Sequence, residues 1–253
     1  MVVAQSIRAP ASKKPLTVDR MRFAYFFLIV CSLIFSSAAY GEVSGEIKLQ
    51  SDDRFRGRSL SAGQPTLDAD ISIDTPIGIY AGASITAILK GKNRAGLQGY
   101  DGYVGYVAQV DENTAVDIGL AAYRFTSKYS GDQRDQYAEI YAGVSSGRFA
   151  AYVHYTPSYL GKSVPTIYTD FSYFRPIGSD FNITAHVGLL TQTSGPARLG
   201  RARTRYDTRV AISRPVLGLD AELAWTYGGA NDRYFAGPWN GNSALVFSLS
   251  KHF

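Results

Sequence analysis

The sequence predicts an all-β protein, specifically a transmembrane antiparallel up-and-down β-barrel of about 12 strands. Three observations support this fold class. Apolar and polar residues alternate with a period of two along much of the chain, as they do in strands with two different faces. The connections between these segments are short and long in turn. The chain also begins with a segment typical of exported proteins.

Residues 1–41 are predicted to be a cleaved signal peptide. A basic stretch that ends at Arg22 precedes an apolar run over residues 23–35, and small residues follow this run. The run is shorter than the roughly 20 apolar residues that a membrane-spanning helix needs. Two cleavage motifs and two start positions fit the segment: Ala39-Tyr40-Gly41 or Ser37-Ala38-Ala39, and Met1 or Met21.

Most of the basic charge belongs to this leader. Residues 1–41 hold five basic residues and one acidic residue, so residues 42–253 carry only +1 of the formal net charge of +5. A nucleic-acid partner therefore loses its main support. The single cysteine, Cys31, also lies in the leader, which excludes disulfides and thiol catalysis from the mature chain.

The barrel is predicted to occupy residues 42–253. In the segment 219–228, apolar residues such as Leu223 and Trp225 alternate with polar or small ones such as Glu222 and Thr226. The same alternation predicts strands over 43–53, 66–74, 79–89, 98–110, 114–126, 136–145, 148–156, 166–175, 181–191, 205–214, 219–228 and 242–253.

The connections distinguish a barrel from a soluble β-sandwich. A sandwich shows turn signals every 8–12 residues, whereas this repeat is about 18 residues long, the length of a membrane strand plus a connection. Because both ends of an even-stranded barrel share the periplasmic side, the short turns are expected there and the long loops outside. The expected long loops are 54–65, 90–97, 127–135, 157–165, 192–204 and 229–241.

The C-terminus adds a further signal. Leu245, Phe247 and Leu249 alternate with polar or small residues, and the chain ends in Phe253. A terminal aromatic residue after an alternating strand is similar to the end of outer-membrane proteins. The resemblance implies that Phe253 is an assembly signal for the barrel assembly machinery. Lys251 departs from the apolar pattern, and its stem can snorkel to the membrane interface.

Two stretches resemble the TorF family, proteobacterial proteins with a proposed porin role. The first runs from Ser51 to Ile85 and reads SDDRFRGRSLSAGQPTLDADISIDTPIGIYAGASI, and the second runs from Tyr137 to Gly161 and reads YAEIYAGVSSGRFAAYVHYTPSYLG. The resemblance implies an outer-membrane barrel with a channel role and without catalytic residues. The matching positions in the first stretch are Ser51, Asp52, Arg54, Phe55, Arg56, Gly57, Ser59, Ser61, Pro65, Gly78, Tyr80, Ala81 and Gly82.

The alternation also predicts which charged residues face the lumen. Two interpretations stay open: a charged eyelet that selects permeating ions, or ion pairs that brace or plug a narrow lumen, because 12 strands lie between filled and open barrels. Arg54 and Arg56 are expected either at the outer rim or folded down onto Asp52, Asp68 or Asp70. The predicted lumen and constriction residues are Asp52, Arg54, Arg56, Asp68, Asp70, Asp101, Asp117, Glu139, Asp170, Arg209, Asp220 and Glu222.

No constellation in the sequence predicts catalysis. His154 and His186 face the lumen by parity, near Asp170, and are interpreted as polar lining. The chain shows no zinc-spaced His/Cys cluster and no phosphate-binding glycine motif, so neither a metal nor a cofactor is expected. Three residues fit the alternation badly: Tyr168 and Phe174 point inward and Arg124 outward, for which a strand bulge is the expected explanation.

The long loops are rich in basic residues. Together with Asp53 and Arg205 they hold fourteen basic and four acidic residues, a net +10, which leaves −9 for the wall and turns. Contact between the rim and the anionic phosphates of lipopolysaccharide is therefore expected, through Arg198, Arg201 and Arg203.

The sequence thus predicts a passive outer-membrane channel for small polar solutes or ions, with a mild cation preference. The alternative is a non-conducting structural or adhesion barrel. The solute, the width of the lumen and the oligomeric state stay open.

Overall fold

The structure of the protein is a computed structural model, and it describes residues 41–90, 94–126, 136–161, 163–195, 203–229 and 243–253. Within it, Gly41–Phe253 forms one compact unit. The signal-peptide prediction falls on residues outside the described part and stays a prediction.

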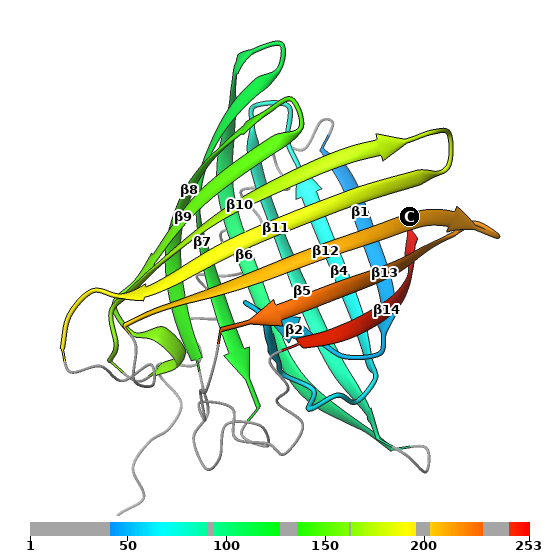
Figure 1. Cartoon of the computed structure of the whole chain (residues 1–253). Helices are drawn as coiled ribbons and strands as arrows, with labels where there is room; N and C mark the ends of the chain where they lie inside the picture. Colours follow the sequence, from blue (N-terminus) through cyan, green and yellow to red (C-terminus); the bar gives the residue numbers. More distant parts are fainter. Residues whose placement is uncertain (1–40, 91–93, 127–135, 162, 196–202, 230–242) are drawn as a thin grey trace, which may run out of the picture. The chain divides into compact units, whose positions relative to one another are not determined.

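Twelve strands form one closed antiparallel barrel, which confirms the predicted fold class (Figure 1). Strands that follow one another in the chain are neighbours in the sheet, and β1 pairs with β14 to close it. The barrel strands are β1 (Glu42–Gln50), β4 (Thr66–Asp74), β5 (Ile79–Lys90), β6 (Arg94–Asp111), β7 (Thr114–Phe125), β8 (Gln136–Ser146), β9 (Phe149–Thr156), β10 (Thr166–Ile177), β11 (Phe181–Gln192), β12 (Thr204–Val216), β13 (Leu219–Gly228) and β14 (Ser243–His252).

The predicted strand limits agree with the observed ones to within a few residues, and for β4 and β13 they coincide. The largest difference is the expected loop 90–97, because β5 extends to Lys90 and β6 already begins at Arg94. The cause is a β-bulge at Gln98: Gly99 pairs with Thr86 and Leu97 with Ala87, so Gln98 is an extra residue that breaks the alternation.

The outward face of the barrel is apolar. Ile71, Leu120 and Val210 are about half exposed, at 57%, 56% and 48%, although they are large hydrophobic side chains on regular strands. Such a continuous apolar surface is stable only against lipid, and a closed barrel leaves no strand edge unsatisfied there. The protein is therefore an integral outer-membrane barrel. No helix among the described residues is long and apolar enough to cross a bilayer.

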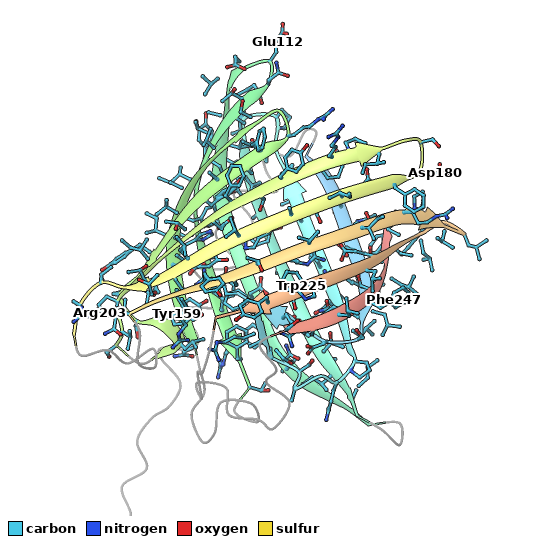
Figure 2. The ribbon with its side chains drawn as sticks, in the orientation of Figure 1. Glu112, Tyr159, Asp180, Arg203, Trp225 and Phe247 are labelled. Carbon is cyan, nitrogen blue, oxygen red and sulfur yellow. The ribbon has the colours of Figure 1, made fainter. Side chains whose placement is uncertain are left out.

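The two ends of the barrel differ. Glu112 and Asp180, in two short turns, lie at one end, and Tyr159 and Arg203 lie at the other (Figure 2). Both termini of the barrel are at the short-turn end, where the backbones of Gly45 and Phe253 exchange hydrogen bonds of 2.8 and 3.0 Å. This arrangement agrees with the expected placement of turns and loops.

The C-terminal strand fits this end closely. The Phe253 ring occupies the space that a side chain at Gly45 would need, since its Cε2 lies 2.6 Å from an ideal Cβ there. Lys251 donates a hydrogen bond of 2.9 Å to the carbonyl of Gly218, so its ammonium group reaches the turn at the interface. The role of Phe253 as an assembly signal stays a prediction.

The three residues that fit the alternation badly have another explanation than a bulge. β10 pairs in continuous register with β9 and β11, so Tyr168 and Phe174 face inward on a regular strand. Arg124 faces outward opposite Tyr100, and its Nη1 donates a hydrogen bond of 2.9 Å to the Tyr100 hydroxyl. The expected bulge is wrong at these positions. The polar ends of Tyr168 and Arg124 find partners instead, and Phe174, which has no polar end, is 46% exposed.

Candidate functional site

The long connection between β1 and β4 folds into the barrel rather than staying at its rim. Within residues 51–65, here called the lumen hairpin, β2 (Arg54–Phe55) and β3 (Arg58–Ser59) form a small separate sheet. Arg54 and Arg56 line the interior hollows, so counting these two with the outer rim was wrong.

One carboxylate organises the base of the lumen hairpin. Asp52 is 6% exposed and accepts hydrogen bonds from Ser59 Oγ and, at 2.9 Å, from Ser61 Oγ. The backbone N–H of Gly63 and the Nε of Arg54 reach the same carboxylate at 3.2 and 2.7 Å. The chain folds locally around this acid because four donors from both sides of the turn converge on it. The pair of Asp52 with Arg54 was among the expected ones.

The tip of the lumen hairpin lies against the inner face of β12 and β13. Arg56 and Gly57 form the turn with φ angles of +48° and +75°, the left-handed region that a two-residue hairpin turn requires. A Cβ on Gly57 would lie 2.7 Å from Gly228 Cα and from Asp207 Cβ. Only glycine allows this close approach to β12 and β13.

The Arg56 side chain binds the wall formed by β8 and β10. Its Nη2 lies 2.8 and 2.9 Å from the two carboxylate oxygens of Glu139, and both side chains are almost fully buried, at 7% and 1% exposure. The guanidinium Cζ lies 4.1 Å from the centre of the Tyr168 ring. The expected partners Asp52, Asp68 and Asp70 were wrong for Arg56, because its partner lies 83 residues further along the chain.

Apolar residues fill the space around this contact at the loop end of the lumen. The short helical turn η1 (Tyr159–Gly161) places Tyr159 and Leu160 at 4% and 1% exposure against Leu60 of the lumen hairpin. Aromatic side chains complete the cluster, and Tyr137 and Tyr159 meet edge to face at 5.3 Å. The other members of the cluster are Val164, Tyr168 and Leu190, with Phe55, Tyr123 and Phe125 packed against it.

Two hollows adjoin the lumen hairpin, with volumes of about 1010 and 460 Å³. Arg54, Phe55 and Arg56 line both of them, so the tip of the lumen hairpin is in contact with both spaces. The larger hollow is lined by charged residues of β1, β4 and β12, whereas the smaller one is lined mainly by tyrosines and histidines.

Tyrosines cover the lumen side of β5 to β10, and all of those named below except Tyr123 lie over a glycine of a neighbouring strand. A Cβ on Gly105 would meet the Tyr80 hydroxyl at 2.3 Å, and a Cβ on Gly119 would meet the Tyr141 hydroxyl at 2.3 Å. These two hydroxyls meet each other at 2.6 Å. Asp117 joins them, since it accepts hydrogen bonds from Tyr80 at 2.6 Å and from Tyr152 at 3.1 Å. The tyrosine wall comprises Tyr80, Tyr103, Tyr123, Tyr141, Tyr152 and Tyr168.

The sequence interpretation missed the tyrosine wall. The signal is present, since tyrosines share the inward parity with glycines of neighbouring strands, as in the register pair Tyr80 and Gly105. Three further pairs follow the same arrangement: Tyr103 with Gly82, Tyr152 with Gly143, and Tyr168 with Gly188. Alternation alone does not reveal these pairs, because it scores tyrosine as apolar and expects it outside.

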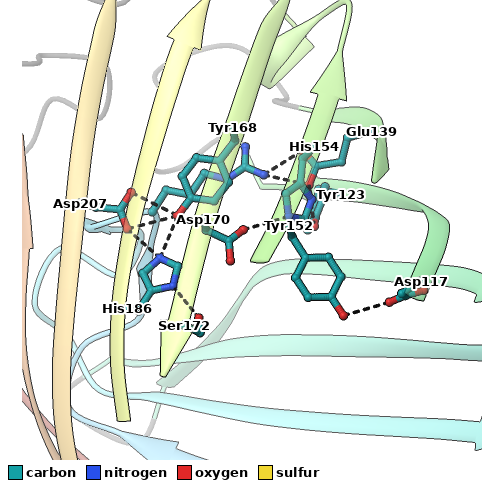
Figure 3. Close-up of polar contacts among 11 residues, drawn as sticks. Asp117, Tyr123, Glu139, Tyr152, His154, Tyr168, Asp170, Ser172, His186 and Asp207 are labelled. Atoms are coloured by element: carbon teal, nitrogen blue, oxygen red, sulfur yellow. Dashed lines mark hydrogen bonds and ion pairs between the residues drawn. The ribbon is translucent and has the colours of Figure 1, made fainter. Parts of the chain in front are cut away.

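The two lumen histidines belong to hydrogen-bonded networks (Figure 3). His154 lies 3.1 Å from Asp170 and 3.3 Å from Glu139. His186 contacts Asp207 at 3.2 Å, Ser172 at 3.1 Å and the Tyr168 hydroxyl at 3.0 Å. These contacts hold the lumen side of β9 to β12 together.

Ser172, His186 and Asp207 have the spacing of a catalytic triad but lack its surroundings. An acyl-transfer site needs backbone N–H donors for the developing oxyanion. Ser172 pairs with Ala150 on one side and His186 on the other, in the middle of a regular strand whose backbone groups belong to the sheet ladders. His186 also shares its Nε2 with Tyr168. The arrangement therefore favours polar lining.

Acidic residues collect on the opposite side of the lumen. Glu46, Asp68, Asp70 and Asp101, here called the acidic wall, line the larger hollow from β1, β4 and β6. Asp68 accepts hydrogen bonds from Gln50 at 2.9 Å and from Thr86 at 2.5 Å, and Asp101 accepts one from Ser84.

The remaining predicted lumen residues fall into three places. Arg209 and Glu222 form an ion pair on β12 and β13 that lines the larger hollow. Asp117, Glu139 and Asp170 belong to the tyrosine and histidine side described above. Asp220 lies at the short-turn mouth, half exposed and 3.6 Å from His252, away from the lumen hairpin.

A buried acid at the base of the lumen hairpin has an altered pKa. Burial and the nearby negative charge of Asp68 raise the pKa of Asp53 from 3.8 to about 7, and a hydrogen bond from Gln98 offsets part of this rise. Asp53 lies in the connection beyond β1, where it also faces Asp52 and Lys48.

Of the predicted lipopolysaccharide contacts, Arg198 and Arg201 lie outside the described residues. Arg203 is exposed at the loop end, where its Nη2 donates a hydrogen bond of 3.0 Å to the carbonyl of Gly195. Contact of these arginines with lipopolysaccharide stays a proposal.

Comparison with known proteins places the chain in a family. None of the proteins with curated functions matches it. The KdgM porin structure is similar, with a TM-score of 0.50 and 9% identity, and the match covers 83% of this chain and 98% of that chain. The NanC porin structure gives a TM-score of 0.52 and 10% identity, with coverage of 83% and 98%. At such identities the likeness shows the porin-type barrel fold alone. A family model described as "Bacterial protein of unknown function (Gcw_chp)" matches residues 36–253, and the chain therefore belongs to this family.

Proposed function

We propose that this barrel is a passive outer-membrane channel for small polar solutes or ions, narrowed by the lumen hairpin. The observation that supports this most is the pair of hollows of about 1010 and 460 Å³, both with charged residues in their lining, that share the hairpin tip as lining. Water-filled space with charged walls inside an apolar belt is the arrangement through which porins pass solutes. The similarity of Ser51–Ile85 and Tyr137–Gly161 to the TorF family supports the same role.

One observation favours the alternative, a non-conducting structural or adhesion barrel. The buried cluster around Leu60, Tyr159 and Leu160 fills the lumen at the loop end beside the lumen hairpin. A barrel that is braced in this way by packed side chains needs no pore, since a barrel of this size lies between filled and open ones.

Conductance across a planar lipid bilayer distinguishes the two functions. Purified protein is added to one side at moderate salt, and discrete current steps are expected as single barrels insert. Heat-unfolded protein at the same concentration controls for membrane damage by detergent. Insertion without current steps, with the barrel shown to be folded in the same preparation, would favour the structural barrel.

A further inference from the structure

The contact between the lumen hairpin and the far wall has the chemistry of a guanidinium receptor. Glu139 provides two carboxylate oxygens within 2.9 Å of Arg56 Nη2. The ring faces of Tyr168 and Tyr159 lie 4.1 and 5.5 Å from the guanidinium carbon. A planar, weakly hydrated and delocalised cation is what a buried carboxylate between aromatic faces binds best.

Glu139 and Tyr168 are held in place by other residues of the barrel wall as well as by Arg56. Glu139 also accepts a hydrogen bond of 3.1 Å from the Tyr123 hydroxyl and lies 3.3 Å from His154 Nδ1. The Tyr168 hydroxyl lies 3.2 Å from both carboxylate oxygens of Asp207. The site is therefore expected to keep its geometry when the guanidinium leaves.

The hairpin side of the contact is less well supported. Arg56 has a φ angle of +48°, a conformation that residues with a Cβ disfavour. Its Nη1 is buried and makes no hydrogen bond with the described residues. The ionic attachment of the tip to this wall thus depends on the single carboxylate of Glu139.

We propose that Glu139 and Tyr168 of the barrel wall, together with Tyr159 of η1, form a guanidinium-binding site, and that Arg56 is its built-in ligand, which holds the lumen hairpin across the channel. Vacating the site releases the hairpin tip, and a small molecule with a guanidinium group binds in place of Arg56. Only the effect on conductance rests on the proposed channel function; the binding site does not.

Binding is tested on Arg56→Ala, which leaves the wall site empty. The probe is propylguanidinium, which reproduces the end of the arginine side chain, and the matched cation is propylammonium at equal ionic strength. The thermal unfolding midpoint of Arg56→Ala is expected to rise with propylguanidinium at a concentration about tenfold below that needed for propylammonium, because the ammonium is a point charge without a stacking plane. Wild-type protein and the double variant Arg56→Ala/Glu139→Gln are expected not to respond. Equal responses to the two cations, or a response in the double variant, would overturn the site.

Release of the hairpin is tested by hydrogen exchange of the peptide that covers residues 51–65. Exchange in Arg56→Ala and in Glu139→Gln is expected to be about tenfold faster or more than in the wild type, as a buried charge pair is broken in each. Arg56→Lys keeps the charge and is expected to give an intermediate rate. Arg175→Ala removes the same charge from an exposed position at the short-turn end of β10, outside the lining of both hollows, and is expected to exchange like the wild type. Exchange in Arg56→Ala at the wild-type rate would contradict the proposal.

Conductance separates this proposal from the proposed function. Larger current steps are expected for Arg56→Ala and Glu139→Gln than for the wild type and Arg175→Ala. If none of the proteins conducts, the channel function fails, while the binding and exchange results still decide the guanidinium site. If all conduct equally although exchange is faster, the hairpin does not restrict the channel, and the proposal that Arg56 holds the hairpin across the channel is overturned.

Discussion

At the scale of single residues, the lumen is shaped by pairs of a tyrosine and a glycine on neighbouring strands. Each ring lies over a glycine, where no side chain competes for the space, as for Tyr168 over Gly188. The hydroxyl then reaches a partner further around the wall, as Tyr80 reaches Tyr141 and Asp117. The pairs keep large side chains flat against the sheet, so the wall is covered without filling the lumen.

We predict that Gly105→Ala destabilises the barrel by about 1–3 kcal/mol, because its Cβ displaces the Tyr80 ring and two partly buried hydrogen bonds are lost. Gly102→Ala is the matched control on the same strand, since its Cβ would meet only the carbonyl of Gly82, at 3.5 Å. The measurement is the temperature at which the folded form disappears in a detergent gel. A loss that is the same in both variants would show that the tyrosine pairing contributes nothing particular.

Asp53 predicts a dependence of stability on pH. Its pKa is about 7 in the folded barrel and 3.8 as the ordinary value, so the folded state holds the proton more tightly than the unfolded chain. Between these two pKa values, unfolding therefore releases the proton of Asp53. The contribution of Asp53 to the free energy of unfolding falls as the pH rises from about 4 to about 7, and it is constant above pH 7. This change of stability with pH is opposite in sign to that of an acid stabilised by an ion pair.

The test compares the thermal unfolding midpoint of the wild type with that of Asp53→Asn over pH 5 to 8. The wild-type midpoint is expected to fall relative to the variant as the pH rises towards about 7, because asparagine cannot ionise. Asp220→Asn, at the short-turn mouth, controls for an acid that is half exposed. Parallel curves for wild type and Asp53→Asn would show that Asp53 does not titrate in this range.

At the scale of elements, the strands could be predicted because alternate residues face the membrane and the lumen, which favour apolar and polar side chains respectively. β4 and β13 show this alternation without interruption, and their limits were predicted correctly. The start of β6 could not be predicted, since the bulge at Gln98 reverses the pattern within the strand.

The lumen hairpin could not be predicted for a different reason. Its strands β2 and β3 have two residues each, too few to show any periodicity. The direction of Glu139 into the lumen follows from alternation, but that of Arg56 does not, since Arg56 lies in the hairpin turn. Their pairing depends on which elements face each other across the barrel. The Asp52–Arg54 pair was foreseeable because it is local.

The placement of turns and loops predicts the orientation in the membrane. A protease tag inserted after Ser194, in the long connection between β11 and β12, is expected to be cut on intact cells. A tag after Gly178, in the short turn between β10 and β11, is expected to be cut only after the outer membrane is permeabilised. Cleavage of the second tag alone on intact cells would mean that the barrel is inserted the other way round.

At the scale of the whole molecule, the lumen has two unlike sides. Among the residues of β1, β4 and β6 that line the larger hollow beside the acidic wall, Lys48 is the only basic one. Its ammonium group lies 3.7 Å from Glu46. On the other side, the acids of β7 to β10 are bonded to tyrosines, histidines and Arg56. Uncompensated negative charge therefore lies along one side of the passage.

We predict a mild preference for cations, because a negative wall in a narrow passage attracts cations and repels anions. Reversal potentials across a salt gradient measure it, and the preference is expected to disappear at high salt through screening. Asp70→Asn is expected to weaken it, whereas Glu112→Gln, at the tip of a short turn (Figure 2), is expected to leave it unchanged. A clear anion preference would mean that the basic residues outside the acidic wall control permeation.

The reach of the lumen hairpin also fixes an order of events in biogenesis. The hairpin is among the first parts of the barrel to be synthesised, yet its tip rests against Asp207 and Gly228, which belong to late strands. Until β12 and β13 have joined the sheet, Gly57 has no surface to touch. Such contacts between distant parts of a sequence form late in folding. The hairpin tip therefore docks late, after β12 and β13 have joined the sheet, and its docking reports that the barrel has closed.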